Sequence, residues 1–138
     1  MVKIFLDANI LFSASKIGSP IRKLLENIQH HSVLVSHPGV LEEATRNLTA
    51  KKPEWIEGFE SLCNFLEISP RLGTCPETSL PAKDQPVLAA AIGCRADILL
   101  TGDRRHFGTL FGSTLSGVKV FSVRQMAEEM VERGWLKK

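Results

Sequence analysis

Short, mostly apolar runs alternate with helical patterns along this chain, and this alternation constrains its fold more than any other feature. The runs are Val2–Leu6, Val33–Val35, Leu66–Ile68, Ile98–Leu100 and Val118–Phe121. Parallel strands are covered by helices on both faces, so they carry continuous apolar runs instead of an apolar–polar alternation. We therefore predict an α/β fold: a three-layer α/β/α sandwich around a central, mainly parallel sheet of about five short strands.

Helical patterns fill most of the segments between these runs. The predicted helices start near Pro20, Pro38, Glu54, Pro86 and Val123. Ser19 suits the N-cap of the first, and Ser122 with Gln125 has the spacing of a capping box at the last. The segment 71–83, which is interrupted by glycine and proline, predicts a loop. The whole pattern indicates one domain over residues 1–138.

Bulk composition narrows the classes of function only slightly. The chain has 17 Lys and Arg against 15 Asp and Glu, a net charge of +2 that is too small to indicate a nucleic-acid partner. Cys63, Cys75 and Cys94 contain no C-x-x-C pair, so neither a disulfide framework nor a zinc knuckle is expected. The sequence shows no signal peptide and no run of membrane-spanning length, and we expect a soluble cytoplasmic protein without membrane contact.

Two aspartates follow predicted strands at the point where each strand ends. Asp7 comes directly after Val2–Leu6, and Asp103 comes shortly after Ile98–Leu100. The carboxyl ends of parallel strands meet at one edge of the sheet, and ligands of such sheets bind there. Asp97 precedes the same strand as Asp103 and should lie at the opposite edge, as a turn residue.

Two further acids are candidates for the same edge. Asp84 stands at the start of an apolar helix, where it is either a plain N-cap or a member of the site. In the helix that starts at Pro38, Glu43 lies nearer the apolar stripe than Glu42, so Glu43 is the better candidate for facing a cleft.

Four carboxylates at one edge repel each other, which raises their pKa values and weakens the fold. A divalent cation removes this repulsion. Carboxylate oxygens suit Mg²⁺ or Mn²⁺, and no His/Cys set favours zinc. Acid-rich metal sites of this kind commonly serve phosphodiester hydrolysis, and no residue of the chain is an obvious covalent nucleophile.

Four segments in this order and spacing resemble the PIN domain: LDANILFSA, SHPGVLEEATRNL, KDQPVLAAAIGCRADILLTGD and RRHF. The resemblance runs from about Val2 to Phe121. It implies a metal-dependent ribonuclease, and many small bacterial and archaeal members are VapC-type toxins of toxin–antitoxin pairs. The acidic positions of the family fall on Asp7, Glu43, Asp84 and Asp103, and its polar neighbours fall on Asn9 and Thr101.

Roles can be assigned to these residues as hypotheses. Asp7, Asp84 and Asp103 would bind Mg²⁺ or Mn²⁺, directly or through water, while Glu43 would complete the site or orient the attacking water. Asn9 would orient Asp7, or would only close the turn after the strand.

Basic residues directly follow Asp103. Arg104 and Arg105, with His106 next to them, are placed to contact substrate phosphates, although a solvated arginine pair explains them equally well. The lysines at 16, 23, 51 and 52 and the arginine at 22 are interpreted as surface charges, with contacts to a nucleic-acid backbone as the alternative.

Two other classes of function compete with a ribonuclease. A PIN-like module can bind RNA or a partner without cutting. An acid after the first strand also marks phosphatases that form an aspartyl-phosphate, but those of the haloacid dehalogenase type have a second aspartate where this chain has Asn9.

The partners implied by the ribonuclease reading are an RNA substrate, an antitoxin protein and a second copy of the chain. Trp55, Phe59 and Phe65 could supply an apolar patch for such a homodimer, or could simply belong to the core.

Overall fold

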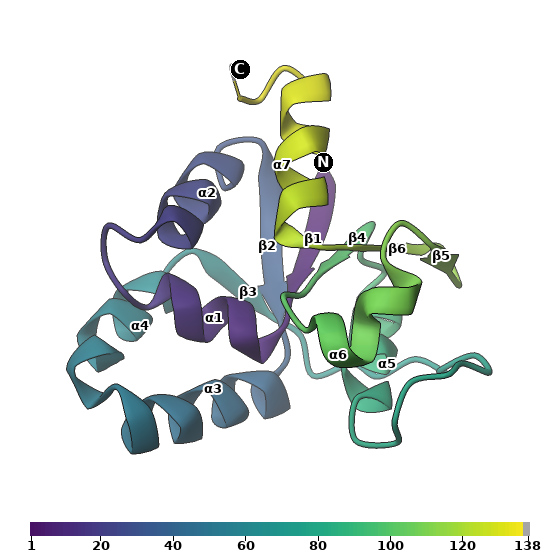
Figure 1. Cartoon of the computed structure of the whole chain (residues 1–138), viewed down its shortest axis with the longest axis horizontal. Helices are drawn as coiled ribbons and strands as arrows, with labels where there is room; N and C mark the ends of the chain where they lie inside the picture. The colour runs from purple at the N-terminus through teal and green to yellow at the C-terminus, as the bar shows by residue number, and fades with distance from the viewer. Residues whose placement is uncertain (137–138) are drawn as a thin grey trace.

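The structure is a computed structural model that describes residues 1–136. Its strands are β1 (Val2–Leu6), β2 (Ser32–Ser36), β3 (Leu66–Ile68), β4 (Ile98–Leu100), β5 (Thr114–Leu115) and β6 (Val118–Phe121). Its helices are α1 (Ala8–Ala14), α2 (Pro20–Ile28), α3 (Pro38–Lys51), α4 (Ile56–Cys63), α5 (Gln85–Gly93), α6 (Arg104–Phe107) and α7 (Val123–Glu132). Two short 3₁₀ turns are η1 (Pro53–Trp55) and η2 (Gly108–Leu110) (Figure 1).

The strands form one sheet in the order β3-β2-β1-β4-β6-β5, with helices on both faces. All pairs are parallel except β5 with β6. The predicted three-layer sandwich with a mainly parallel sheet is confirmed. Strand β5 was not predicted, because a two-residue strand is too short to show a periodic pattern.

The order of the strands creates a switch point in the middle of the sheet. The chain runs outward from β1 through β2 to β3, and then returns to place β4 on the other side of β1. The two connections therefore leave the carboxyl ends of β1 and β4 in opposite directions. A crevice is expected outside such a pair of strand ends, and it is the usual ligand site of open α/β sheets.

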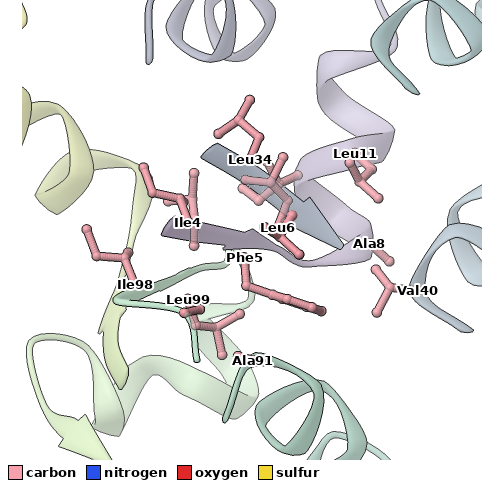
Figure 2. Close-up of a cluster of buried hydrophobic side chains, with 14 of the residues drawn as sticks. Ile4, Phe5, Leu6, Ala8, Leu11, Leu34, Val40, Ala91, Ile98 and Leu99 are labelled. Carbon is pink, nitrogen blue, oxygen red and sulfur yellow. The ribbon is translucent and has the colours of Figure 1, made fainter. Parts of the chain in front are cut away.

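The core fills the space on both sides of β1. Figure 2 shows Leu34 and Leu11 of α1 on one side of β1, whereas Phe5 and Leu99 extend to the other side, where Ala91 of α5 lies. All five of these side chains are buried. Successive side chains of a strand point to opposite faces of the sheet. The packing of β1 against both layers of the core therefore sets its register, and with it the position of Asp7 at the end of the strand.

The ends of the helices agree with the caps read from the sequence. The Ser19 hydroxyl accepts the Arg22 N–H at the start of α2, and Ser122 and Gln125 exchange both bonds of a capping box at the start of α7. The short helix α1 was not predicted. It begins directly after β1 because the Asp7 side chain accepts the Ala8 N–H and so caps it.

Two sequence interpretations of the helical layer need correction. Arg22 is not a surface charge, since its side chain is 2% exposed and lies between α1, α2 and α4. The pattern over residues 54–66 does not form one helix, because the chain turns after Cys63 and enters β3 at Leu66. Phe59 belongs to the core, which leaves a smaller apolar surface for a dimer than the three aromatic residues suggested.

The segment 71–83 contains no helix or strand, as predicted. It packs closely on the end of α5, where a Cβ atom added at Gly93 would lie 2.7 Å from the backbone nitrogen of Gly73. Within residues 1–136, no helix has both the length and the apolar character needed to cross a membrane.

Candidate metal centre

Asp7 and Asp103 lie at the switch point, at the carboxyl ends of β1 and β4. Leu6 pairs with Leu100 in the sheet, and the Asp7 N–H donates to the Leu100 carbonyl oxygen. Asp97 lies at the other edge, where its carboxylate accepts the backbone N–H of Lys3 at 2.8 Å. The direction of β4 therefore separates two aspartates that are close in sequence.

Asp7 is the most buried of the four candidate carboxylates, with 5% exposure. Its Oδ1 accepts the Ala8 N–H at 2.7 Å, and its Oδ2 accepts the Thr101 hydroxyl at 2.8 Å. The Asn9 amide also donates to Oδ2, at 3.2 Å. These donors fix the orientation of the carboxylate before any ligand arrives.

The pKa of Asp7 is raised above its ordinary value. Burial is the largest cause, because it penalises the charged form. The negative charges of Glu43 and Asp103 raise the pKa further, whereas the hydrogen bonds from Thr101 and Ala8 oppose the increase. Repulsion among the acids therefore raises the pKa of Asp7, as predicted from the sequence, but desolvation contributes more to the shift.

Thr101 connects Asp7 to Asp103. It is fully buried, and because its one proton goes to Asp7, its oxygen is available to accept the Asn9 amide at 3.3 Å and the Asp103 N–H at 3.2 Å. Asn9 in turn accepts the Gly102 N–H at 2.8 Å. The two polar neighbours thus hold the loop after β4 against the start of α1.

Asp84, Asp103 and His106 form the tightest group of titratable side chains in the site. His106 Nδ1 lies 2.9 Å from Asp103 Oδ2 and 3.3 Å from Asp84 Oδ2. One oxygen or nitrogen from each side chain falls within 4.8 Å of the other two. Such a group can hold a metal ion, since it offers two carboxylates and an imidazole at short range.

A buried oxygen of Asp84 supports this assignment. Among residues 1–136, Asp84 Oδ2 is the one buried side-chain oxygen or nitrogen without a hydrogen-bond partner. His106 Nδ1 lies 3.3 Å from it, but a proton on Nδ1 would be donated to one acceptor, and the contact with Asp103 is shorter, at 2.9 Å. A buried acceptor without a donor is costly, and a cation would compensate for it.

Glu43 reaches the same region from α3. A cleft of about 270 Å³ is lined by the four candidate acids, Asp7, Glu43, Asp84 and Asp103, and by Asn9, Phe12, Ser13, Asn47, Lys51, Lys83 and Val87. Glu42, one residue earlier, is exposed and pairs with Arg46 at 3.5 Å. The structure therefore brings all four carboxylates to one cleft, while their roles as ligands or catalysts stay predictions.

For several basic residues, the position in the structure differs from the role predicted from the sequence. Arg104 and Arg105 are exposed on α6 and are not among the residues that line the cleft, whereas His106 contacts two of the acids. The spacing of His106 three residues after Asp103 was a usable signal, because a helix brings positions i and i+3 together. Lys51, which was interpreted as a surface charge or a contact to a nucleic-acid backbone, lines the cleft together with Lys83, which no local pattern indicated.

Comparisons with known proteins support the fold. No family model matches the sequence, and a search of curated proteins finds no significant match. Among solved structures, a chain of "Crystal structure of VapBC2 from Rickettsia felis bound to a DNA fragment from their promoter" aligns with a TM-score of 0.63 and 15% sequence identity. The alignment covers 88% of this chain and 98% of that chain. At this identity the likeness shows a shared fold.

Proposed function

We propose that this protein is a PIN-like endoribonuclease that uses Mg²⁺ or Mn²⁺ to hydrolyse RNA phosphodiester bonds by water attack. One observation carries the proposal: four carboxylates from four separate parts of the chain line a single cleft at the switch point of the sheet. A divalent cation bound there would lower the pKa of water and offset the charge that develops on the phosphate. The fold shared with a VapBC2 chain agrees with this assignment.

The burial and the hydrogen bonds of each residue in the cleft suggest its role in the proposed reaction. Asp84 and Asp103 would hold the cation, and Asp7 would take part from its fixed, buried position. Glu43 is exposed within the cleft, so it can orient the attacking water and accept its proton. Asn9 and Thr101 position Asp7 and the loop that carries Asp103.

Water is the nucleophile because the chain offers no activated alternative in the cleft. None of Cys63, Cys75 and Cys94 lines it, and burial raises the pKa of all three thiols, which keeps them protonated and unreactive. Both oxygens of Asp7 already accept hydrogen bonds, so Asp7 is poorly placed to attack a phosphate itself. This argues against the aspartyl-phosphate phosphatase.

Cations and aromatic rings beside the cleft suit a single-stranded nucleic acid. Lys51 and Lys83 line the cleft, and Phe12 extends its wall toward Trp55, with ring centroids 5.5 Å apart. Lys52 lies 5.2 Å from the Trp55 ring. Phosphates would contact the ammonium groups, and unpaired bases can stack on exposed aromatic surface.

The test is cleavage of an unstructured, end-labelled RNA by the purified protein. We expect cleavage with Mg²⁺ or Mn²⁺ and none with EDTA, while Ca²⁺ should support binding better than turnover because it tolerates loose geometry and acidifies water less. A Glu43→Gln variant should lose activity, and Glu42→Gln, its exposed neighbour, serves as the matched control. Robust cleavage in EDTA would exclude the metal mechanism. RNA binding without cleavage under any of these conditions would favour the non-catalytic module.

We further propose that the ribonuclease is the toxin of a toxin–antitoxin pair, and the fold shared with a VapBC2 chain supports this role. An antitoxin partner would be encoded by a neighbouring gene. Co-expression with a small DNA-binding protein from immediately upstream should yield a stable complex and suppress both cleavage and growth arrest. A homodimer is proposed alongside, and a monomeric mass by light scattering at micromolar concentration would contradict it.

A further inference from the structure

The imidazole of His106 lies against the carboxylates of Asp84 and Asp103, two of the proposed metal ligands. It enters the group through Nδ1, the ring atom that faces both Asp84 and Asp103. Short helix α6 holds it there, because Asp103 caps that helix by accepting the His106 N–H at 3.1 Å. The backbone of His106 is thus tied to Asp103, and its ring is turned back over the carboxylate of the same residue.

The separations between these atoms match those between neighbouring ligands of one metal ion. At metal–ligand distances of about 2.1 Å, two adjacent ligands of an octahedral ion lie about 3.0 Å apart. The observed separations from His106 Nδ1 are 2.9 Å to Asp103 and 3.3 Å to Asp84. These two separations suit neighbouring ligands of one ion, and one ligand atom from each of the three side chains lies within 4.8 Å of the others.

The burial of Asp84, Asp103 and His106 also supports a shared cation. Side-chain exposure is 23% for His106, 16% for Asp84 and 23% for Asp103, and Asp84 Oδ2 lacks a hydrogen-bond partner among the described residues. When the ring pairs with Asp103, that oxygen is left without a partner. A cation between the three atoms would contact Asp84 Oδ2 directly.

We infer that His106 is a direct ligand of the metal ion through Nδ1, and that this nitrogen makes the site prefer Mn²⁺ to Mg²⁺. The inference rests on the proposed function and specifies which cation that function uses. Mg²⁺ binds through carboxylates, phosphates and water, whereas an imidazole nitrogen favours first-row transition ions, the series to which Mn²⁺ belongs. Ligation through Nδ1 requires a neutral ring whose proton is on Nε2.

Pulsed electron paramagnetic resonance on the Mn²⁺-loaded protein tests the bond itself. We expect ¹⁴N modulation from a coordinated imidazole in the parent and in His30→Asn, the matched control, whose histidine is exposed and is not a cleft-lining residue. The modulation should disappear in His106→Asn and in His106→Gln. Bound Mn²⁺ without ¹⁴N modulation, or modulation that survives both His106 variants, overturns the inference.

Measurements of Mn²⁺ and Mg²⁺ affinity test whether His106 makes the site prefer Mn²⁺. Mn²⁺ binding followed by the loss of the free-ion signal should weaken by about 10-fold or more in His106→Asn, by analogy with the loss of other metal-site contacts. Mg²⁺ affinity, measured by competition, should change by less than about 3-fold, since an oxygen ligand set remains. Equal losses for the two ions would contradict the preference. Melting curves without metal establish that both variants are folded.

The outcomes separate this inference from the proposed function. Metal-dependent RNA cleavage by a parent protein whose bound Mn²⁺ shows no nitrogen ligand overturns the inference alone. Clear nitrogen ligation in a protein that cleaves no RNA overturns the function and leaves the ligand assignment standing.

Discussion

At the scale of single residues, the direction of β4 decides which aspartates belong to the site. Asp97 and Asp103 flank the same strand, and a rise of about 3.3 Å per residue separates them by about 15–20 Å. Asp97 caps the amino edge of the sheet through the Lys3 N–H, whereas Asp103 lines the cleft. The two residues are chemically identical, so they form a matched pair for mutagenesis.

Asp103→Asn should reduce the single-turnover rate of RNA cleavage by ~10²-fold or more, because it removes a charge that would hold the cation. The fold should survive, since an amide oxygen can still accept the His106 N–H that caps α6. Asp97→Asn should leave the rate within a few-fold of the parent, as expected for an exposed position away from the site. Equal losses in two well-folded variants would mean that the site has been placed at the wrong edge.

The raised pKa of Asp7 predicts how the stability of the metal-free protein depends on pH. The native state holds the proton of Asp7 more tightly than the unfolded state, so this group lowers the free energy of unfolding as pH rises from its ordinary pKa through its raised one. Asp7→Asn removes the ionisation. The free energy of unfolding of the variant, minus that of the parent, should therefore be larger at pH about 7 than at pH about 4.

Chemical denaturation of both proteins in EDTA at the two pH values measures this difference of differences. Hydrogen bonds that the amide cannot reproduce lower the stability of the variant at both values and cancel in the comparison. A difference that is constant, or that is larger in acid, would contradict the assignment of a buried, unfavourable charge to Asp7.

At the scale of elements, one buried arginine joins the helices on the side of the sheet where α1 lies. Arg22 of α2 donates to the carbonyl oxygens of Ala14 in α1 and Gly58 in α4, at 3.1 and 2.9 Å, and to the Ser61 hydroxyl at 2.9 Å. Its charge is paired with Glu26 at 3.2 Å. Gly58 allows this close packing, because a Cβ atom there would lie 1.9 Å from the Ser15 carbonyl oxygen.

Arg22→Met should lower the free energy of unfolding by about 3 kcal/mol or more, because it leaves two buried carbonyl oxygens without donors. Arg22→Lys should recover only part of this loss, since an ammonium group lacks the planar fork that reaches four acceptors. Lys23→Met, at the exposed neighbouring position, should change stability by about 0.5 kcal/mol or less. Urea denaturation provides the measurement, and similar midpoints for the variants at 22 and 23 would show that Arg22 does not join the helices.

At the scale of the whole molecule, the cleft is the point where otherwise separate parts of the chain meet. Asp7 follows β1, Glu43 lies on α3, Asp84 precedes α5 and Asp103 follows β4. In Figure 1 these elements come from both layers of helices and from the centre of the sheet. A cation that bound their carboxylates would tie the layers together and would reduce the repulsion that raises the pKa of Asp7.

Mn²⁺ at about 100-fold above its dissociation constant should stabilise the native state by about 2.7 kcal/mol and raise the melting temperature by about 5–10 °C. Thermal scans with and without the ion provide the measurement. The increase should be lost in Asp103→Asn and should not be reproduced by KCl at the same ionic strength. An equal rise with KCl would indicate general screening instead of a bound cation.

Most of the helices and strands, and the edge of the sheet at which Asp7 and Asp103 lie, could be predicted from the sequence, because they depend on local patterns. Continuous apolar runs mark the parallel strands, side-chain caps mark the helix starts, and a residue that follows a parallel strand must lie at its carboxyl edge. Glu43 could be preferred over Glu42 for the same local reason, the position of the apolar stripe on one helix.

Which side chains meet inside the cleft depends on how the helices and strands pack together. The contact of His106 with Asp84, the placement of Lys51 and Lys83 in the cleft, and the burial of Arg22 join positions that are far apart in the chain. A one-dimensional pattern records which face of an element is apolar, but it carries no information on the distance between two elements. That distance is set by how the side chains of neighbouring layers pack, so the polar contacts across layers appear only when the whole core has formed.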